Sequence, residues 1–156
     1  IKTCLAESKT KTGMLLVLER SVGLNEYINN GIMMDAMVSQ QVLVNIFVPN
    51  TPLHDGAAII RGDRIAAAAC FLPLTDNPYL SSELGTRHRA AIGISEVSDA
   101  LVLVVSEETG RISAAQNGKL MNNLDEPNLR RLLSESAVQR TVQEKRSSHF
   151  WNRRSK

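Results

Sequence analysis

The segment Leu101 to Ser106 constrains the fold more than any other part of this sequence. It reads Leu-Val-Leu-Val-Val-Ser, a near-continuous aliphatic run without alternation of apolar and polar residues. A strand of this kind is buried on both faces of its sheet, so the fold must supply a covering layer on each side. Met14 to Leu18 is a second short apolar run of the same type. The sequence therefore predicts a buried central sheet.

Two tight turns predict hairpins in this sheet. Gly62-Asp63 joins the extended runs Ala57–Arg61 and Arg64–Leu72 and is a strong two-residue hairpin signal. Glu107 to Gly110 turns the chain into a further strand at Arg111–Gln116. Because helical segments lie between the strands, we predict an α/β fold. Its central sheet is expected to be mixed and mostly antiparallel, flanked by helices on both faces.

The remaining segments carry helix signals or are ambiguous. Ser39 suits the N-cap of a helix that runs to Phe47, and Thr86 suits the N-cap of a helix from about Arg87 to Val97. Ile32–Val38 fits a helix or a strand, with the strand favoured. Two more helical segments are expected at Asn25–Asn30 and Glu126–Gln139.

Composition places the chain among globular proteins of one ordinary domain. Of its 156 residues, 43% are hydrophobic and 22% are charged, which excludes disorder or a coiled coil as a description of the whole. The longest apolar run, Ile65 to Leu72, is too short for a membrane helix. Two cysteines make a poor disulfide framework, so we expect a reducing, cytosolic setting, with Cys70 as a small buried hydrophobe. No initiator Met is present, and we expect the chain to be a piece of a longer protein.

Charge is unevenly distributed along the chain. Residues 139–156 carry a net charge of +5, whereas residues 1–138 carry −3. A mildly acidic folded part with six aromatic residues does not resemble a nucleic-acid binder, so we expect no nucleic-acid partner. The basic end could contact RNA or an anionic membrane, but its composition favours a solvated and partly disordered tail.

Two clusters carry residues suited to metal and phosphate. In the cluster from His54 to Ala57, Asp55 precedes a glycine that leaves the backbone open to a ligand, and its carboxylate could hold magnesium or manganese. An ordinary Asp-Gly turn is the alternative. The cluster from Gly85 to Arg89 places two arginines and a histidine at a helix start, where phosphate is favoured. Its alternative is a solvated basic helix start.

Two further clusters complete the chemistry that we expect. Ser106 to Gly110 could supply a phosphate donor and a second metal carboxylate, although a solvated acidic turn explains it as well. Phe71 and Leu72 could hold a planar base, or Phe71 could belong to the core. Together the acid on the glycine loop, the Arg-His-Arg helix start and the acidic hairpin indicate metal-dependent chemistry on a nucleoside triphosphate. The chain has no phosphate-loop, dinucleotide or serine-hydrolase motif.

These residues resemble the diadenylate cyclase (DAC) domain family. Its two hallmark motifs, Asp-Gly-Ala and Arg-His-Arg, stand here as Asp55–Ala57 and Arg87–Arg89, in the family's order and separation. The resemblance implies a DAC catalytic domain over residues 13–138, preceded by a linker or helix remnant at 1–12 and followed by the basic tail at 139–156. It is strongest to the membrane-anchored bacterial CdaA or DacA type. This type implies a location on the cytosolic face of a bacterial membrane and a possible membrane-bound regulatory partner.

The resemblance also implies a reaction. Two ATP molecules condense into cyclic di-AMP with release of two pyrophosphates, as each 3′-hydroxyl attacks the α-phosphate of the other ATP. Each domain holds one ATP, so two domains must meet as a face-to-face homodimer. The implied cofactor is a divalent metal, Mn2+ or Mg2+, with Co2+ as a further option. A non-catalytic module that binds ATP or cyclic di-AMP is the alternative function.

The family's roles carry over to individual residues. Asp55 would bind the metal and help activate the 3′-hydroxyl, with His54 and Glu108 as further candidate ligands. Phe71, where the family often has Tyr, would pack on adenine, and the Leu72 main chain would read its edge. The catalytic residues implied are Asp55, Arg87, His88 and Arg89. The implied ATP-binding residues are Gly56, Ala57, Phe71, Leu72, Gly85, Thr86, Arg87, His88, Arg89, Ser106 and Glu108.

Overall fold

The computed structural model describes residues 1–137 of the chain in two units. The first unit runs from Ile1 to Leu124, and the second begins at Asp125. In the second unit, residues 126–137 are helical, and the predicted end of this helix at Gln139 lies outside the described residues. The basic tail predicted at 139–156 lies outside them as well.

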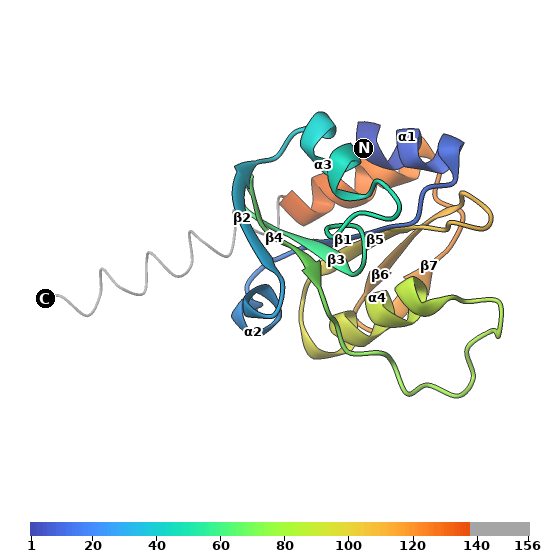
Figure 1. Ribbon diagram of the computed structural model, residues 1–156. Coiled ribbons are helices and arrows are strands. Elements are labelled where there is room, and N and C mark those ends of the chain that lie inside the picture. The colour runs from blue at the N-terminus through green and yellow to red at the C-terminus, as the bar shows by residue number, and fades with distance from the viewer. Residues whose placement is uncertain (138–156) are drawn as a thin grey trace, which may run out of the picture. The chain divides into compact units, whose positions relative to one another are not determined.

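A seven-stranded sheet forms the centre of the first unit, in the order β2-β4-β3-β1-β5-β6-β7 (Figure 1). Of its pairings, β1–β3 is parallel and the other five are antiparallel. This confirms the prediction of a mixed, mostly antiparallel sheet. The elements of the unit are α1 Lys2–Thr10, β1 Met14–Leu18, α2 Asn25–Asn29, β2 Ile32–Met37, α3 Gln40–Ile46, β3 Ala57–Arg61, β4 Arg64–Cys70, α4 Thr86–Val97, β5 Leu101–Val105, β6 Ile112–Gln116 and β7 Lys119–Met121.

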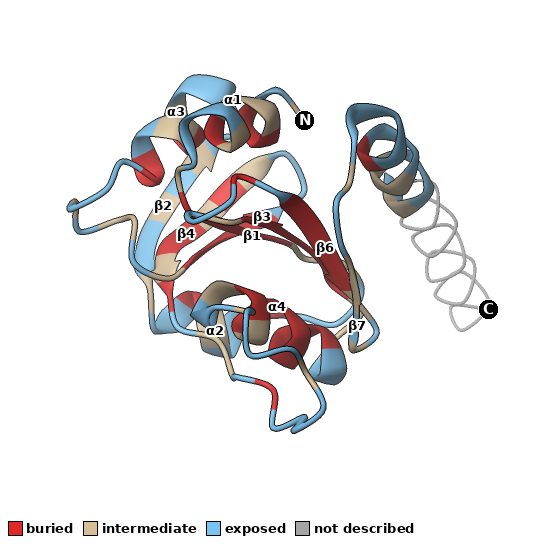
Figure 2. Cartoon of the chain, turned by 90° about the vertical axis from the view of Figure 1, so that its right-hand side faces the viewer, coloured by how far each residue is buried: buried red, intermediate tan, exposed pale blue. Residues whose placement is uncertain are grey.

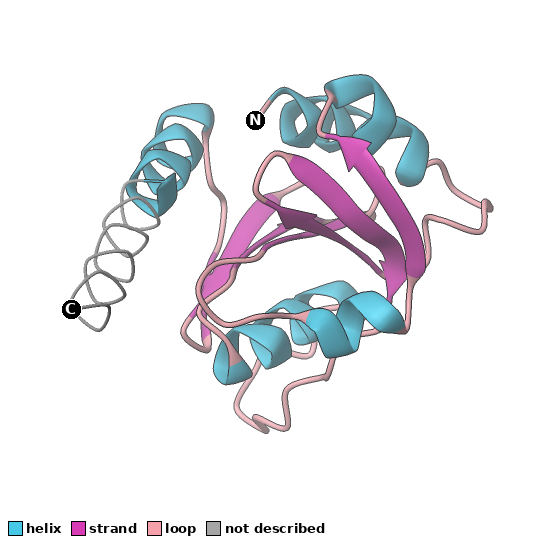
Figure 3. Ribbon diagram, turned by 90° about the vertical axis from the view of Figure 1, so that its left-hand side faces the viewer, coloured by secondary structure: helices cyan, strands magenta, loops and turns pink. Residues whose placement is uncertain are grey.

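Helices cover both faces of the sheet, as the sequence predicted. Helices α1 and α3 lie over one face, and α2 and α4 lie over the other (Figures 2 and 3). All five residues of β5 are buried between these layers, which explains why the strand is aliphatic throughout. Within residues 1–137, no helix combines the length and the hydrophobicity that crossing a bilayer requires.

Of the two N-caps predicted from the sequence, one is confirmed and one is wrong. The Ser39 Oγ accepts a hydrogen bond from the Val42 N–H at 3.2 Å, which confirms the predicted cap of α3. The prediction of Thr86 as a cap was wrong by one residue. Gly85 has the extended backbone of an N-cap, and Thr86 is already helical. The first N–H groups of α4 therefore receive no side-chain cap.

Strand β2 forms one edge of the sheet and is irregular. Its pairing with β4 shifts between Met33 and Ala36, where Asp35 adopts a left-handed backbone with φ of 46°. Asp35 also forms an ion pair with Arg64 of β4. The ambiguous segment Ile32–Val38 therefore contains a strand, as favoured, but its pairing with β4 is interrupted.

Both cysteines are free and buried, as the sequence predicted for Cys70. Burial raises the pKa of the Cys70 thiol to about 11, because the thiolate would lose its hydration. Cys70 therefore stays protonated at neutral pH and packs as a small apolar side chain.

Replacing Gly93 with Ala should destabilise the protein, although alanine is the better helix former. A Cβ on Gly93 of α4 would overlap the carbonyl group of Pro73, with the carbonyl carbon of Pro73 only 2.8 Å away. We expect Gly93→Ala to lower the free energy of unfolding by about 1–3 kcal/mol, because backbone yields less readily than a side chain. Urea denaturation would measure this.

Gly23→Ala is the matched control for this prediction. No atom lies within 4 Å of the position that its Cβ would take, and its φ is outside the left-handed region. We expect its free energy of unfolding to stay within about 0.5 kcal/mol of the unmodified chain. Equal stability of the two variants would show that the contact between α4 and Pro73 is not tight.

Candidate functional site

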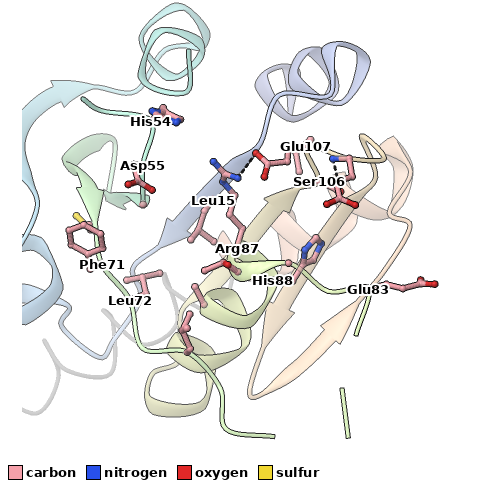
Figure 4. A pocket seen from close by; sticks show the side chains of 18 residues that line it. Leu15, His54, Asp55, Phe71, Leu72, Glu83, Arg87, His88, Ser106 and Glu107 are labelled. Carbon is pink, nitrogen blue, oxygen red and sulfur yellow. Dashed lines mark hydrogen bonds and ion pairs between the residues drawn. The ribbon is translucent and has the colours of Figure 1, made fainter. Parts of the chain in front are cut away.

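A cavity of about 570 Å³ opens at one end of the sheet (Figure 4). It lies where β1 and β3 begin, where β4 and β5 end, and where α4 starts. This volume is in the range of small-molecule sites. Eleven of the predicted site residues line it, namely His54, Asp55, Gly56, Phe71, Leu72, Gly85, Thr86, Arg87, His88, Ser106 and Glu108.

Two predicted site residues, Ala57 and Arg89, are not in the lining of the cavity. Ala57 is fully buried at the start of β3. Arg89 is two residues beyond Arg87 on α4, and because a helix turns by about 100° per residue, the two side chains leave it in different directions. The main-chain carbonyl of Arg89 instead accepts a hydrogen bond from the Thr75 N–H at 3.1 Å.

One wall of the cavity carries His54 and Asp55 (Figure 4). The Asp55 carboxylate is exposed, and no partner for it is recorded among the described residues. Gly56 follows with φ of +108°, and a Cβ there would lie 2.7 Å from the Cys70 carbonyl oxygen. Only glycine allows this close approach of the loop to β4, and the approach fixes where Asp55 enters the cavity.

The His54 ring is oriented by its own loop. Its Nδ1 lies 2.7 Å from the Thr51 carbonyl oxygen, which can only accept a hydrogen bond. Nδ1 therefore donates its proton to this carbonyl, and Nε2 is the ring nitrogen left for another partner. A backbone carbonyl on one ring nitrogen and a metal on the other is a common arrangement for histidine ligands.

The three predicted metal ligands do not form one protein-only site. Within residues 1–137, no three His, Cys, Asp or Glu side chains are grouped closely enough to hold a metal ion. His54 and Asp55 lie on one wall, and the turn after β5, which carries Ser106 and Glu107, lies on the opposite wall (Figure 4). Two ligands still suit Mg2+ or Mn2+, because such ions take their remaining ligands from substrate phosphates and water.

The opposite wall is built to receive an anion. Gly85 and Thr86 are exposed at the uncapped start of α4, whose N–H groups and dipole favour negative charge. The Ser106 Oγ accepts hydrogen bonds from the N–H groups of Glu108 and Thr109, at 3.3 and 3.2 Å. Its hydroxyl proton is therefore available to a ligand. Arg87 supplies the positive charge of this wall.

Glu107 is a functional candidate that the sequence analysis did not select. Its Oε2 lies 2.8 Å from the Arg87 Nη1, so it forms an ion pair inside the cavity. The sequence analysis chose its neighbour Glu108 as the carboxylate of this turn. Both glutamates line the cavity, and nothing in two adjacent identical residues could have told which one contacts Arg87.

His88 contributes to this wall as a neutral side chain. It is 9% exposed, and burial lowers its pKa below the ordinary value because the imidazolium would lose its hydration. At neutral pH the ring can therefore donate one N–H to an anion but adds no charge.

Apolar residues form the third part of the cavity. Phe71 is 65% exposed, and its ring lies beside Leu72 at the end of β4 (Figure 4). The Asn30 side chain forms two hydrogen bonds with the Phe71 backbone. Its Oδ1 accepts from the Phe71 N–H at 3.0 Å, and its Nδ2 donates to the Phe71 carbonyl at 3.1 Å. The exposed ring therefore projects from a fixed backbone, which suits stacking on a planar group.

The lowered pKa of His88 predicts a loss of stability in acid. Below pH 6.5 the His88 imidazole binds a proton more readily in the unfolded chain than in the folded chain. The free energy of unfolding should therefore fall as pH drops through this value. His88→Gln removes this contribution. Denaturation between pH 7.5 and 5.5 should therefore show the unmodified chain losing more stability than the variant. Parallel curves would contradict the burial of a neutral ring.

Comparison with known families agrees with this geometry. Residues 2–120 match the model of the DAC family, described as the nucleotide-binding part of the DisA bacterial checkpoint controller. The chain belongs to the DAC family. It is 50% identical over 144 residues to the DAC protein "Cyclic di-AMP synthase CdaA" of Bacillus subtilis, which covers 92% of this chain and 53% of that protein. It is 52% identical over 143 residues to a "Diadenylate cyclase" of Listeria monocytogenes, over 92% of this chain and 52% of that one.

Two solved structures show the same fold. A crystal structure of a double mutant of DacA from Staphylococcus aureus has a TM-score of 0.85 and 52% sequence identity, covering 86% of this chain and 90% of that chain. A hypothetical membrane spanning protein from Bacillus cereus has a TM-score of 0.77 and 48% identity, covering 80% of this chain and 61% of the other. The predicted family and fold are confirmed. The chain spans about half the length of the curated relatives that it matches.

Proposed function

We propose that this DAC domain is a diadenylate cyclase, which condenses two ATP molecules into cyclic di-AMP and releases two pyrophosphates. The observation that carries the proposal is the cavity. It combines an exposed ring for a base, a cationic wall for phosphates, and, on the facing wall, a carboxylate that has no recorded partner within residues 1–137. The names of the relatives, "Cyclic di-AMP synthase CdaA" and "Diadenylate cyclase", support the same activity.

The reaction is a phosphoryl transfer that occurs twice. In each step a bond forms between the 3′-oxygen of one ATP and the α-phosphorus of the other, and the bond from that phosphorus to the bridging oxygen breaks. Pyrophosphate leaves with the electron pair, and the hydroxyl proton passes to a base. Asp55 is the base that we assign, because its carboxylate is exposed in the cavity without a recorded partner among the described residues.

The cavity supports separate roles for its three parts. Phe71 and Leu72 would hold adenine. Arg87, the neutral His88 N–H, Ser106 and the exposed start of α4 at Gly85 and Thr86 would hold the triphosphate. For Arg89 and Ala57 we propose only indirect roles, since they do not line the cavity.

A divalent ion fits the wall that carries His54 and Asp55, and Mn2+, Mg2+ or, less selectively, Co2+ would suit these ligands. When bound, such an ion would neutralise phosphate charge and lower the pKa of an attacking hydroxyl. Glu108 belongs to the turn after β5, and it forms no three-residue metal group with His54 and Asp55 within residues 1–137, so it would contact the ion only by way of a bound substrate or water.

The geometry of the reaction requires two copies of the chain. A cavity of about 570 Å³ suits one nucleotide, and in-line attack requires the 3′-hydroxyl of each nucleotide to face the α-phosphate of the other. Two cavities that face each other in a homodimer satisfy this requirement. A lone chain would bind ATP but could not turn it over.

We further propose that the whole protein works at the cytosolic face of a bacterial membrane, where a membrane-bound partner would regulate it. The similarity to a hypothetical membrane spanning protein from Bacillus cereus supports a membrane link. Fractionation of cells that make the whole protein would test the location.

Asp55→Asn should separate catalysis from binding. Loss of the base should lower cyclic di-AMP formation by about 10²–10⁴-fold, the usual range for a general base. ATP binding in metal-free buffer should remain within a few-fold, because Asp55 is on the wall opposite the phosphate-binding residues. Mass spectrometry of the products and calorimetry of ATP binding would measure the two effects.

Asp63→Asn in the exposed hairpin turn is the control, and it should leave both quantities unchanged. Equal turnover by the Asp55 variant would remove this carboxylate from the mechanism. ATP binding by the unmodified chain without any product, at every protein concentration, would favour the non-catalytic module.

Protein concentration should change the rate per molecule. Because two chains must meet, the rate of cyclic di-AMP formation per chain should rise with concentration until the dimer is saturated. Assays over a hundredfold range of protein, with Mn2+ and ATP held constant, would measure this. A rate per chain that stays constant while analytical ultracentrifugation shows only monomers would contradict the need for a dimer.

A further inference from the structure

The Arg87 guanidinium lies directly on the backbone of Gly13, at the start of β1. A Cβ on Gly13 would lie 2.6 Å from the Arg87 Nη1, 2.7 Å from its Cζ and 3.0 Å from the Glu107 Oε2. The distances to the two Arg87 atoms are shorter than carbon–nitrogen or carbon–carbon contacts allow, and the distance to the Glu107 oxygen is tighter than most such contacts. No side chain larger than hydrogen can therefore occupy position 13 while Arg87 and Glu107 keep their places.

The other contacts of the Arg87 guanidinium leave one of its nitrogens available to donate to a ligand. Nη1 donates to the Glu107 Oε2 at 2.8 Å. Nε is buried and has no hydrogen-bond partner, and among residues 1–137 no other buried side-chain nitrogen or oxygen lacks one. No partner of Nη2 is recorded within that part of the chain. Since Arg87 lines the cavity, Nη2 is the donor that a ligand can reach.

The C-terminal end of helix α1 fixes the positions of both Gly13 and Glu107. Helix α1 ends in a left-handed residue, Lys11, and the Thr12 N–H then donates to the Glu7 carbonyl at 2.9 Å, which directs the chain into Gly13. The Ser8 Oγ donates to the Gly110 carbonyl at 2.6 Å. Gly110 closes the turn that carries Glu107. The two residues that contact the guanidinium are therefore anchored to one rigid element.

We infer that Gly13 and Glu107 are positioning residues, which hold the Arg87 guanidinium so that Nη2 faces the phosphates of a bound nucleotide. The inference rests on the proposed function, because it concerns how the cavity binds a triphosphate. A long arginine side chain held in advance loses less conformational entropy when an anion binds than a free one does. Gly13 contributes by the absence of a side chain, and Glu107 by one charge-assisted hydrogen bond.

Gly13→Ala tests the inference without unfolding the chain. The atoms that its Cβ would displace belong to the end of a flexible side chain, and the φ of Gly13 is outside the left-handed region. Calorimetry should show inorganic triphosphate binding weakened by about tenfold or more, in line with the loss of a hydrogen bond to a charged group. Adenosine binding should be unchanged. Gly23→Ala is again the matched control and should alter neither affinity.

A double-mutant cycle separates positioning from a general structural effect. If Gly13 acts through Arg87, then Gly13→Ala should cause no further loss of triphosphate affinity in an Arg87→Ala background. The same tenfold loss in both backgrounds, or no loss in either, would overturn the inference while ATP turnover by the unmodified chain still upheld the proposed function. Failure of the unmodified chain to bind ATP would overturn both.

Glu107 offers an independent test with a conservative rescue. Glu107→Ala should weaken triphosphate binding several-fold, whereas Glu107→Gln keeps an oxygen acceptor for Nη1 and should restore it. Glu126→Ala removes a similar surface ion pair, to Arg130 at 2.8 Å, and should have no effect. Equal triphosphate affinities of the Glu107→Ala and Glu107→Gln variants would overturn the role of this hydrogen bond.

Discussion

The register between β1 and its two neighbours is the constraint on which the site depends. Met14 pairs with Val105 in the antiparallel β1–β5 ladder, and Leu16 pairs with Ala58 in the parallel β1–β3 ladder. Continued to the ends of the strands, these registers bring the start of β1 beside the turn after β5 on one side and beside the loop before β3 on the other. A shift of one residue would turn every side chain of β1 to the opposite face of the sheet and would move the start of β1 away from both of these loops.

This register places two loops with different side chains on the two walls of the cavity. The loop before β3 supplies an exposed carboxylate and an oriented imidazole, whereas the turn after β5 and the start of α4 supply donors and a guanidinium. The guanidinium is partly neutralised by Glu107, which is 63% exposed and therefore screened by water. A bound anion replaces part of that water and is held by groups already in place.

Local sequence was enough to predict most of the sheet and the principal clusters. Aliphatic runs, the Gly62-Asp63 turn and the Ser39 cap depend on neighbouring residues only, and the structure agrees with them. The clusters around Asp55 and Arg87 were visible because their residues are adjacent in sequence. The family was identified from these same two motifs.

What the sequence could not provide are contacts between distant residues and the degree of burial. Gly13 lies 74 positions before Arg87, and Asn30 lies 41 positions before Phe71, so neither relation follows from spacing. His88 looked like a part of the cationic wall, and only its burial shows that it is neutral. Thr86 and Gly85 are both acceptable N-caps, and the backbone alone decides between them.

The irregular strand β2 affects how copies of this chain can meet. An exposed edge strand with a regular ladder can add a strand from another molecule and grow into an extended sheet. The left-handed Asp35 interrupts the ladder at this edge, and β7 at the opposite edge has three residues only. Within residues 1–137, neither edge therefore offers a long regular template for strand addition, and the fold resists fibre-like association through the edges of its sheet.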